Sequence, residues 1–332
     1  MTSWHAREAL AFAGRNGPLL LFGGVLIGLL APPLAEAARP LLGLAVFVFT
    51  LGAFLKVDLP AFHAQIAQRS TIAMVLLWTT FGVPLVMLGL VRLLGLSDGL
   101  ALGMLLCMLA PPVGSAAAIA AMLGLSAPLA LLATVAATLL CPLYIPPLAS
   151  LLVGVDLEID ASGMALRLCT IVGGAFACAL LLRRFAGRFV AENPHAMTGI
   201  AVLGLILVAI GAMRGMQTLF LDRPLDVAGV FGIAFAVNAG FQVLGAALFW
   251  PGGRLRALSV GLVSGNRNVT LVWAAAGTSV VGVQGVELYL AMSVFPIFMM
   301  PALTRGLVAR LLRRAEDAPP EAPAATRSQA SV

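Results

Sequence analysis

The sequence has little charge, which excludes an ordinary soluble domain. Only 10% of the 332 residues are Asp, Glu, Lys or Arg, whereas 61% are hydrophobic. A soluble domain usually carries about 25% charged residues. Apolar stretches of about 20 residues, long enough for a bilayer-spanning helix, follow one another almost from end to end. The composition therefore predicts an all-α integral membrane protein.

The chain also lacks the patterns of disulfides, metal sites and acid–base catalysis. Its four cysteines stand singly in apolar stretches, so we expect them to pack as small apolar side chains. The three histidines lie in loops or near the ends of these stretches, and no Asp, Glu or His lies at the middle of one. We predict no metal, no cofactor and no enzymatic activity. The cysteines are Cys107, Cys141, Cys169 and Cys178.

Ten membrane spans are predicted from the apolar runs. They cover residues 17–35, 38–55, 70–95, 99–123, 126–153, 162–182, 196–214, 226–250, 257–280 and 286–309. Residues 1–16 resemble a short interfacial helix, and residues 315–332, rich in Ala, Pro and Glu, are predicted to be a disordered tail. The spans divide into two sets of five, 17–153 and 154–314, separated by a polar loop.

Charges in the loops predict the orientation in the membrane. The net charge of +6 is scattered over short loops without interleaved aromatics, so no nucleic-acid partner is expected. Basic loop residues follow even-numbered spans, and acidic ones follow the fifth and seventh. By the positive-inside rule, both termini are predicted to be cytoplasmic in a plasma (inner) membrane. The basic residues include Lys56, His63, Arg69, Arg183, Arg184, Arg188, Arg254, Arg256, Arg305, Arg310, Arg313 and Arg314, and the acidic ones Asp156, Glu158, Asp160, Asp222 and Asp226.

Two spans are predicted to be broken at matching places. An odd number of spans in each half inverts the second half relative to the first, as in many secondary transporters. The fourth span contains Pro111, Pro112 and Gly114, and prolines remove backbone donors and interrupt a helix. The ninth contains the polar run 263–268, with Gly265. Cleavage of the first span as a signal peptide would leave nine spans and remove this symmetry.

Arg267 is the most informative single residue. A central arginine in a membrane span costs at least about 2.5–3.5 kcal/mol, so it should face the interior and have a partner. None of the fourteen acidic residues lies at mid-span. Carbonyls of the broken helices or a bound anion could satisfy it, and helix N-termini near Gly114 and Ser115 would add positive potential. An anionic substrate and a structural arginine at the crossing are both open.

Other polar residues within spans complete the candidate site. Asn238 and Gln242 are spaced i, i+4 on one helix face, although such residues also form ordinary bonds between helices. The predicted substrate-binding residues are Arg267, Asn266, Asn268, Ser264, Ser115, Gly114, Asn238 and Gln242.

Residues 48–58, 111–142 and 259–268 resemble the bile acid:sodium symporter family, within the wider bile, arsenite and riboflavin transporter group. The resemblance implies a panel domain of spans one, two, six and seven beside a core domain of the other spans. It also implies that spans four and nine cross at their unwound centres.

The chain departs from the sodium-coupled members of this family at their ion sites. Where those members have a Ser-Asn pair, this sequence has Ala117 and Ala118, and Val263 and Arg267 replace a glutamate and a glutamine. Hydroxyls of a remnant ion site would be Thr79, Thr134 and Thr138. We therefore expect no sodium at the usual sites, and a fixed guanidinium in its place.

The sequence thus predicts a secondary transporter that moves a small or amphipathic organic anion by alternating access. A second possibility is an efflux carrier for arsenite or a metabolite, with Cys107 and Cys141 as soft ligands. A third, from another class, is a receptor or sensor that keeps the transporter fold without moving solute.

Overall fold

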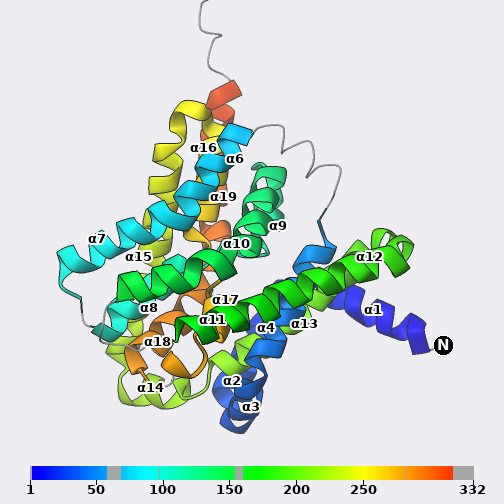
Figure 1. Cartoon of the computed structure of the whole chain (residues 1–332), viewed down its shortest axis with the longest axis horizontal. Helices are drawn as coiled ribbons and strands as arrows, with labels where there is room; N and C mark the ends of the chain where they lie inside the picture. Colours follow the sequence, from blue (N-terminus) through cyan, green and yellow to red (C-terminus); the bar gives the residue numbers. More distant parts are fainter. Residues whose placement is uncertain (1, 58–68, 97, 154–159, 281, 317–332) are drawn as a thin grey trace, which may run out of the picture.

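The structure, a computed structural model, describes residues 2–57, 69–96, 98–153, 160–280 and 282–316. These residues form helices and no β-strand (Figure 1). The helices are α1 (Thr2–Arg15), α2 (Gly17–Leu30), α3 (Pro32–Ala38), η1 (Arg39–Leu41), α4 (Leu42–Leu55), α6 (Arg69–Leu77), η2 (Trp78–Gly82), α7 (Val83–Leu94), α8 (Asp98–Leu109), α9 (Ala116–Met122), α10 (Ala127–Val153), α11 (Ala161–Leu168), η3 (Cys169–Gly173), α12 (Gly174–Glu192), α13 (Pro194–Ala212), α14 (Met216–Asp222), α15 (Pro224–Leu248), η4 (Trp250–Gly252), α16 (Arg254–Gly265), α17 (Val269–Ala276), η5 (Gly277–Val280), α18 (Gln284–Met292) and α19 (Val294–Glu316).

Seven helices of the described residues are long and apolar enough to cross a membrane. They are Pro32–Leu55, Arg69–Leu94, Ala127–Leu152, Ala161–Glu192, Pro194–Ala212, Pro224–Leu248 and Gly285–Arg313. An eighth is formed if the bent pair Arg7–Arg15 and Leu19–Leu30 is one span. The chain is therefore a multi-pass membrane protein. The predicted spans 99–123 and 257–280 are each divided into shorter helices, α8 with α9 and α16 with α17.

The predicted boundary between the first two spans lies several residues too late. α2 ends at Leu30, and a continuous helical segment begins at Pro32. Ala31 between them has φ −124° and ψ 74°, because a residue that precedes proline is disfavoured in the helical region. At the other end, α19 includes two residues of the predicted tail, Ala315 and Glu316. The rest of that tail, with His63, Asp156 and Glu158, lies outside the described residues.

The helices pack in two groups. In the first, which we call the α13 group, α13 packs against α1, α2 and α4, and α12 packs against α4. Helix α11 is counted with this group because α11, η3 and α12 are continuous, although α11 itself packs on α10 and α17. In the second, the α16 group, α15 packs on α16, α10 packs on α9 and α16, and α18 packs on α8. Four more helices join it: α6 packs on α10, α7 and α17 pack on α8, and α19 packs on α15 and α16. Helix α17 also packs on α4 of the first group. We call the end of the molecule at which α14 lies the α14 face, the lower end in Figure 1.

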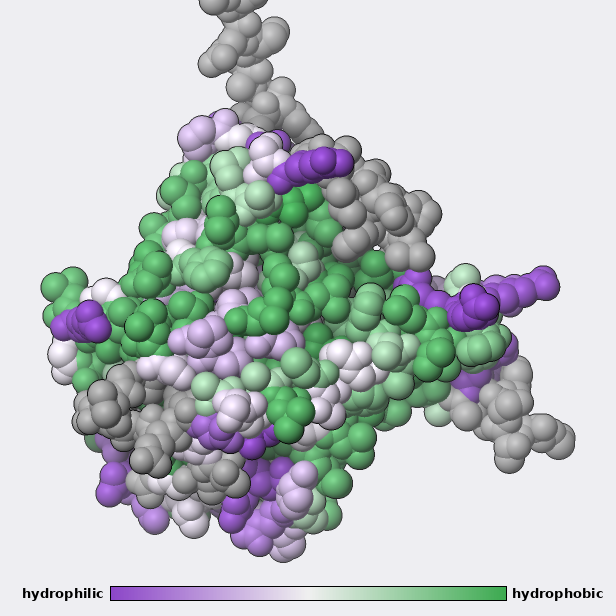
Figure 2. All heavy atoms as spheres, viewed as in Figure 1, coloured by the Kyte–Doolittle hydropathy of each residue, from purple (hydrophilic) through white to green (hydrophobic). Residues whose placement is uncertain are grey.

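Apolar side chains cover much of the outer surface. Large hydrophobic residues of many helices are exposed, including Leu93, Leu143, Phe185 and Leu225. Figure 2 shows hydrophobic residues over much of the upper and middle part of one face, with the most hydrophilic residues mainly at its edges. A soluble monomer rarely exposes large contiguous apolar patches, so this surface fits contact with lipid.

Two glycines let α16 lie directly against α15. Gly261 and Gly265 form a Gly-x-x-x-Gly pattern, which permits close approach of helices in membranes. A Cβ at Gly261 would lie 2.4 Å from the carbonyl oxygen of Gln242 on α15. At Gly265 it would lie 2.4 Å from the carbonyl oxygen of Asn238. The first half of the broken helix is therefore fixed to α15 by backbone contact.

We predict that Gly261→Ala lowers the apparent melting temperature of the purified protein by several degrees, because α15 and α16 must separate to admit the methyl group. The matched control is Gly240→Ala on α15, where a Cβ meets no atom within 4 Å. Its melting temperature should stay the same or rise slightly, since alanine favours helix. Equal melting temperatures for the two variants would contradict the close packing.

Candidate functional site at the helix crossing

Two interrupted helices meet in the α16 group and bond to each other through their backbones. Residues 110–115 separate α8 from α9, and residues 266–268 separate α16 from α17. Pro112 and Arg267 form an antiparallel bridge. The Val113 N–H donates to the Asn266 carbonyl at 2.9 Å, and the Asn268 N–H donates to the Pro111 carbonyl at 2.7 Å. Each break thus satisfies backbone groups of the other, as unwound backbone at membrane depth requires.

Arg267 projects from this crossing into the protein interior, where 1% of its surface is exposed. Its Nη2 donates to the carbonyls of Thr79 at 2.6 Å and Met108 at 2.9 Å, and its Nη1 makes a longer bond of 3.4 Å to the Val263 carbonyl. Among the described residues no carboxylate pairs with it. The Nε atom has no partner there. The positive charge is therefore held by backbone dipoles alone.

A proline makes the Thr79 carbonyl available. Thr79 lies in η2, a π-helical turn in which the Val83 N–H bonds to the Trp78 carbonyl, five residues earlier. In this register the donor for the Thr79 carbonyl would be residue 84. That residue is Pro84, which has no N–H. The guanidinium supplies the missing hydrogen bond.

Met108 and Val263 are left free for related reasons. The α-helical donor for the Met108 carbonyl would be residue 112, again a proline without an N–H. The donor for the Val263 carbonyl would be the backbone N–H of Arg267, but α16 ends at Gly265. Arg267 therefore bonds to three carbonyls, each of which lacks its usual helical donor.

Polar side chains of α15 bind the end of α16. The Asn238 amide donates to the Gly265 carbonyl at 2.9 Å and to Oδ1 of Asn266 at 3.0 Å. The Gln242 amide donates to Oδ1 of Asn238 at 2.6 Å. This chain of bonds stabilises the packing of the two helices and takes up most of the polar atoms that could otherwise contact a solute.

Ser264 is also bonded within the protein. Its hydroxyl donates to the Val260 carbonyl at 2.7 Å and accepts a bond from the Trp78 indole at 2.8 Å. Thr79 donates through its own hydroxyl to the Val75 carbonyl at 2.8 Å. The bond between Trp78 and Ser264 connects the turn η2 to the broken helix, whereas the Thr79 hydroxyl bonds within its own span.

A small cavity lies where α4 of the α13 group faces the crossing. About 20 Å³ of it is open to the centre of a water molecule, enough for roughly one water. The hydroxyls of Thr50 and Thr134 there have no partner among the described residues, nor does that of Ser115 beside it. The Oδ1 of Asn268 accepts from Thr270 at 3.0 Å. The cavity is lined by Phe49, Thr50, Ala53, Phe54, Gly114, Leu131, Thr134, Val135, Thr138 and Asn268.

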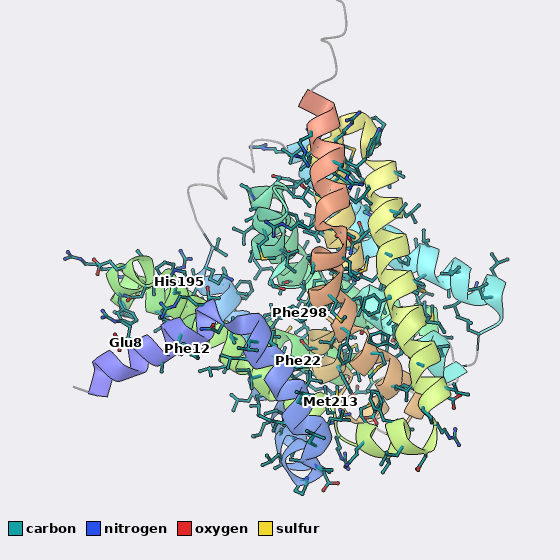
Figure 3. The ribbon with its side chains drawn as sticks, turned by 180° about the vertical axis from the view of Figure 1, so that it is seen from behind. Glu8, Phe12, Phe22, His195, Met213 and Phe298 are labelled. Atoms are coloured by element: carbon teal, nitrogen blue, oxygen red, sulfur yellow. The ribbon has the colours of Figure 1, made fainter. Side chains whose placement is uncertain are left out.

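A larger, apolar cavity of about 480 Å³ also lies between the two groups. Its walls come from α2 and α13 on one side and from α15, α17, α18 and α19 on the other. Phe22 and Met213 face Phe298 across it (Figure 3). Thr270, two residues after Asn268 of the crossing, is a polar residue in its wall. This surface suits the apolar part of an amphipathic molecule.

The structure brings together only part of the predicted site. Gly114, Thr134, Thr138 and Asn268 share the small cavity, with Ser115 next to Gly114. Arg267, Asn266, Ser264, Asn238, Gln242 and Thr79 do not line it. Thr50, Trp78 and Pro84 were not predicted. The position of Pro84, five residues after Thr79, was the sequence signal that the Thr79 carbonyl would lack a donor in a π-helical turn.

The two cysteines named as soft ligands for arsenite lie inside the protein. Cys107 and Cys141 are buried, and neither lines the small or the apolar cavity. Within the described part of the chain no three His, Cys, Asp or Glu side chains gather as a metal site would require.

Residues 41–222 match the model of the Sodium Bile acid symporter family. This range is more than half of the 332 residues and runs from η1 to the end of α14. It contains the first broken helix and ends before the second, which carries Arg267. The resemblance seen in the sequence is thereby confirmed. No curated protein matches the chain in sequence.

We predict that Arg267→Met destabilises the protein, with a clear fall in melting temperature. The variant removes a buried charge but leaves the Thr79 and Met108 carbonyls unsatisfied, at about 1–3 kcal/mol each. Arg188→Met on α12 is the control, because Arg188 makes only an exposed pair with Glu192, and such pairs contribute about 0–1 kcal/mol. A melting temperature of Arg267→Met equal to that of the control would show that the carbonyls do not depend on the guanidinium.

Proposed function

Because the chain belongs to the sodium bile acid symporter family, we propose that it is a secondary transporter that carries a small or amphipathic organic anion across the membrane. The observation that carries this proposal is the crossing itself. Two broken helices hold a guanidinium without a carboxylate partner, beside a cavity that contains unpaired hydroxyls. Interrupted helices that meet in this way are typical of substrate sites in secondary transporters.

Alternating access would come from movement of the two helix groups against each other. We assign the α13 group as the panel domain and the α16 group as the core, in two inverted repeats of five spans each. The broken pairs α8 with α9 and α16 with α17 would count as the fourth and ninth spans. Both cavities described above lie between the groups, which supports a substrate path along this boundary.

Arg267 would act on the substrate through its electric field. Its guanidinium is enclosed by carbonyls and has no free surface, so direct contact falls instead to Asn268, Thr134 and Ser115. In a low-dielectric interior an uncompensated positive charge acts over several ångströms. An anionic group near the crossing would be favoured, while the apolar cavity would receive the rest of the molecule.

The guanidinium also supplies the positive charge that a bound cation would otherwise bring to the crossing. Its two Nη nitrogens donate to three backbone oxygens, the kind of ligand that a hard cation prefers. A second positive charge close to it would be repelled. We therefore propose transport without sodium at the family's usual sites.

The orientation proposed is cytoplasmic for both termini in a plasma membrane. Arg254 begins α16, and Arg305, Arg310 and Arg313 lie near the end of α19. The carbonyl of Leu311 on α19 accepts from Arg254 at 3.2 Å, so these two ends lie at the same end of the molecule. An excess of arginine marks the cytoplasmic side, which makes the α14 face the outer one.

The direct test is uptake into proteoliposomes. With taurocholate at submicellar concentration and a series of short carboxylates as probes, we predict equal initial rates in sodium and in potassium buffer for every anion transported. The reason is that the positive charge at the crossing is covalently fixed. Empty liposomes give the background. Uptake that requires sodium and saturates with it would overturn the proposal.

A gain of sodium response is predicted for the double variant Val263→Glu with Arg267→Gln. It restores the glutamate and glutamine that the sodium-coupled relatives are expected to have, and removes the repelling charge. Sodium, but not potassium, should then raise the melting temperature of the double variant, because a ligand of the folded state stabilises it. Arg267→Gln alone, which lacks the new carboxylate, is the control. The idea fails if the double variant folds and shows no sodium response.

A further inference from the structure

Two arginines of the α13 group contact the α16 group at the α14 face. Arg39, at the start of η1, forms an ion pair with Glu287 of α18. The two side chains are only 12% and 21% exposed. The guanidinium carbon of Arg39 also lies 4.7 Å from the centre of the Trp273 ring on α17, within the range of a cation–π interaction. One arginine thus holds two helices of the opposite group.

Arg167 of α11 makes the second contact. Its Nε donates to the Ala275 carbonyl, near the end of α17, at 2.7 Å. A cation near a helix C-terminus also interacts favourably with the helix dipole. Gly277 follows with φ +56°, and a Cβ there would lie 3.1 Å from the guanidinium carbon of Arg167. Glycine at this position therefore lets the arginine reach the last turn of α17.

Both contacts act on one short helix that leads straight to the crossing. Helix α17 has eight residues and begins directly after Asn268, whose N–H bonds to Pro111. Its far end is held by Arg39 through Trp273 and by Arg167 through Ala275. A movement of the α13 group at the α14 face would thus be transmitted to the site along a single rigid helix.

Arginines at the opposite end bond differently. The Arg183 guanidinium of α12 donates to the carbonyls of Phe54 and Leu55 on α4, which belongs to the same group. Arg254 of α16 donates to Leu311 of α19, again within one group. At the α14 face, by contrast, Arg39 and Arg167 both bond across the boundary between the two groups.

We propose that Arg39 and Arg167 form a latch that closes the α14 face of the transporter. The latch rests on the proposed function, because it has a purpose only if the groups move. Opening toward this face requires the Arg39–Glu287 pair and the Arg167–Ala275 bond to break. A polar cavity of about 420 Å³ reaches Glu287, so water can solvate the carboxylate as the pair separates.

The latch is tested by the side from which a buried cysteine can be labelled. In protein whose four native cysteines are replaced by alanine, Thr270→Cys places a thiol at the apolar cavity between the groups, where Thr270 is 7% exposed. A membrane-impermeant maleimide is then added from one side or the other. With Glu287→Gln or Arg39→Gln, labelling from the α14 face should rise several-fold and labelling from the opposite face should fall.

Such a reciprocal change separates a latch from a merely structural ion pair, whose loss would lower the melting temperature without a change of side. The control is Arg188→Gln, which breaks the exposed Arg188–Glu192 pair within α12 and should leave both rates unchanged. If either single variant does not fold, Arg39→Lys serves instead. It keeps the positive charge but loses the planar guanidinium that contacts both Glu287 and Trp273, so labelling should shift in the same direction by a smaller factor.

The result that overturns the latch is labelling in folded Arg39→Gln and Glu287→Gln that matches the control on both faces. This outcome is independent of the proposed function, which is measured separately by anion uptake into proteoliposomes. Uptake with unchanged labelling would reject the latch and retain the transporter. Reciprocal labelling without uptake of any probe anion would retain a moving contact and reject the transported class.

Discussion

The arrangement of the protein interior depends on the burial of one positive charge without a negative partner. A guanidinium at this depth must bond to backbone oxygens, yet a regular helix has none to spare, because each carbonyl accepts from its own helix. Arg267 can be accommodated only where helices are interrupted. Pro84 and Pro112 remove the donors for two carbonyls, and the end of α16 frees a third. The π-turn, the double proline and the second break therefore each free one carbonyl that accepts a hydrogen bond from Arg267.

This requirement joins three spans that are distant in sequence. The turn η2, the end of α8 and the end of α16 converge on the same side chain, and the two breaks also bond directly to each other. Asn238 then connects the end of α16 to α15. Separation of any one of these helices would leave buried polar groups unpaired, at about 1–3 kcal/mol each. The crossing is thus expected to move as a unit, with flexibility left to its boundary with the α13 group.

The sequence alone could locate both breaks and the arginine, because proline chemistry and the cost of a buried charge are local properties. It could not identify the partners of Arg267. The Thr79 carbonyl lacks a helical donor only in a π-helical register, which tertiary packing selects. Pro84 removes that donor only in this register. Asn238 and Gln242 were correctly placed on one helix face, but their face meets α16 because Gly261 and Gly265 admit α15 so closely. The sequence pattern is the same whether this face of α15 packs against another helix or lines a cavity.

A covalently fixed charge has an energetic consequence that a bound cation does not. A sodium ion that enters and leaves with the substrate transfers the energy of its own gradient, whereas a guanidinium returns unchanged and transfers none. Transport of an anion past Arg267 would therefore follow the gradient of the anion and the membrane potential, which is worth about 2.3 kcal/mol per charge at 100 mV. With the usual potential, negative inside, an anion without a coupled ion is driven outward. If Arg267 takes the place of sodium as proposed, it would therefore also set the favoured direction of transport.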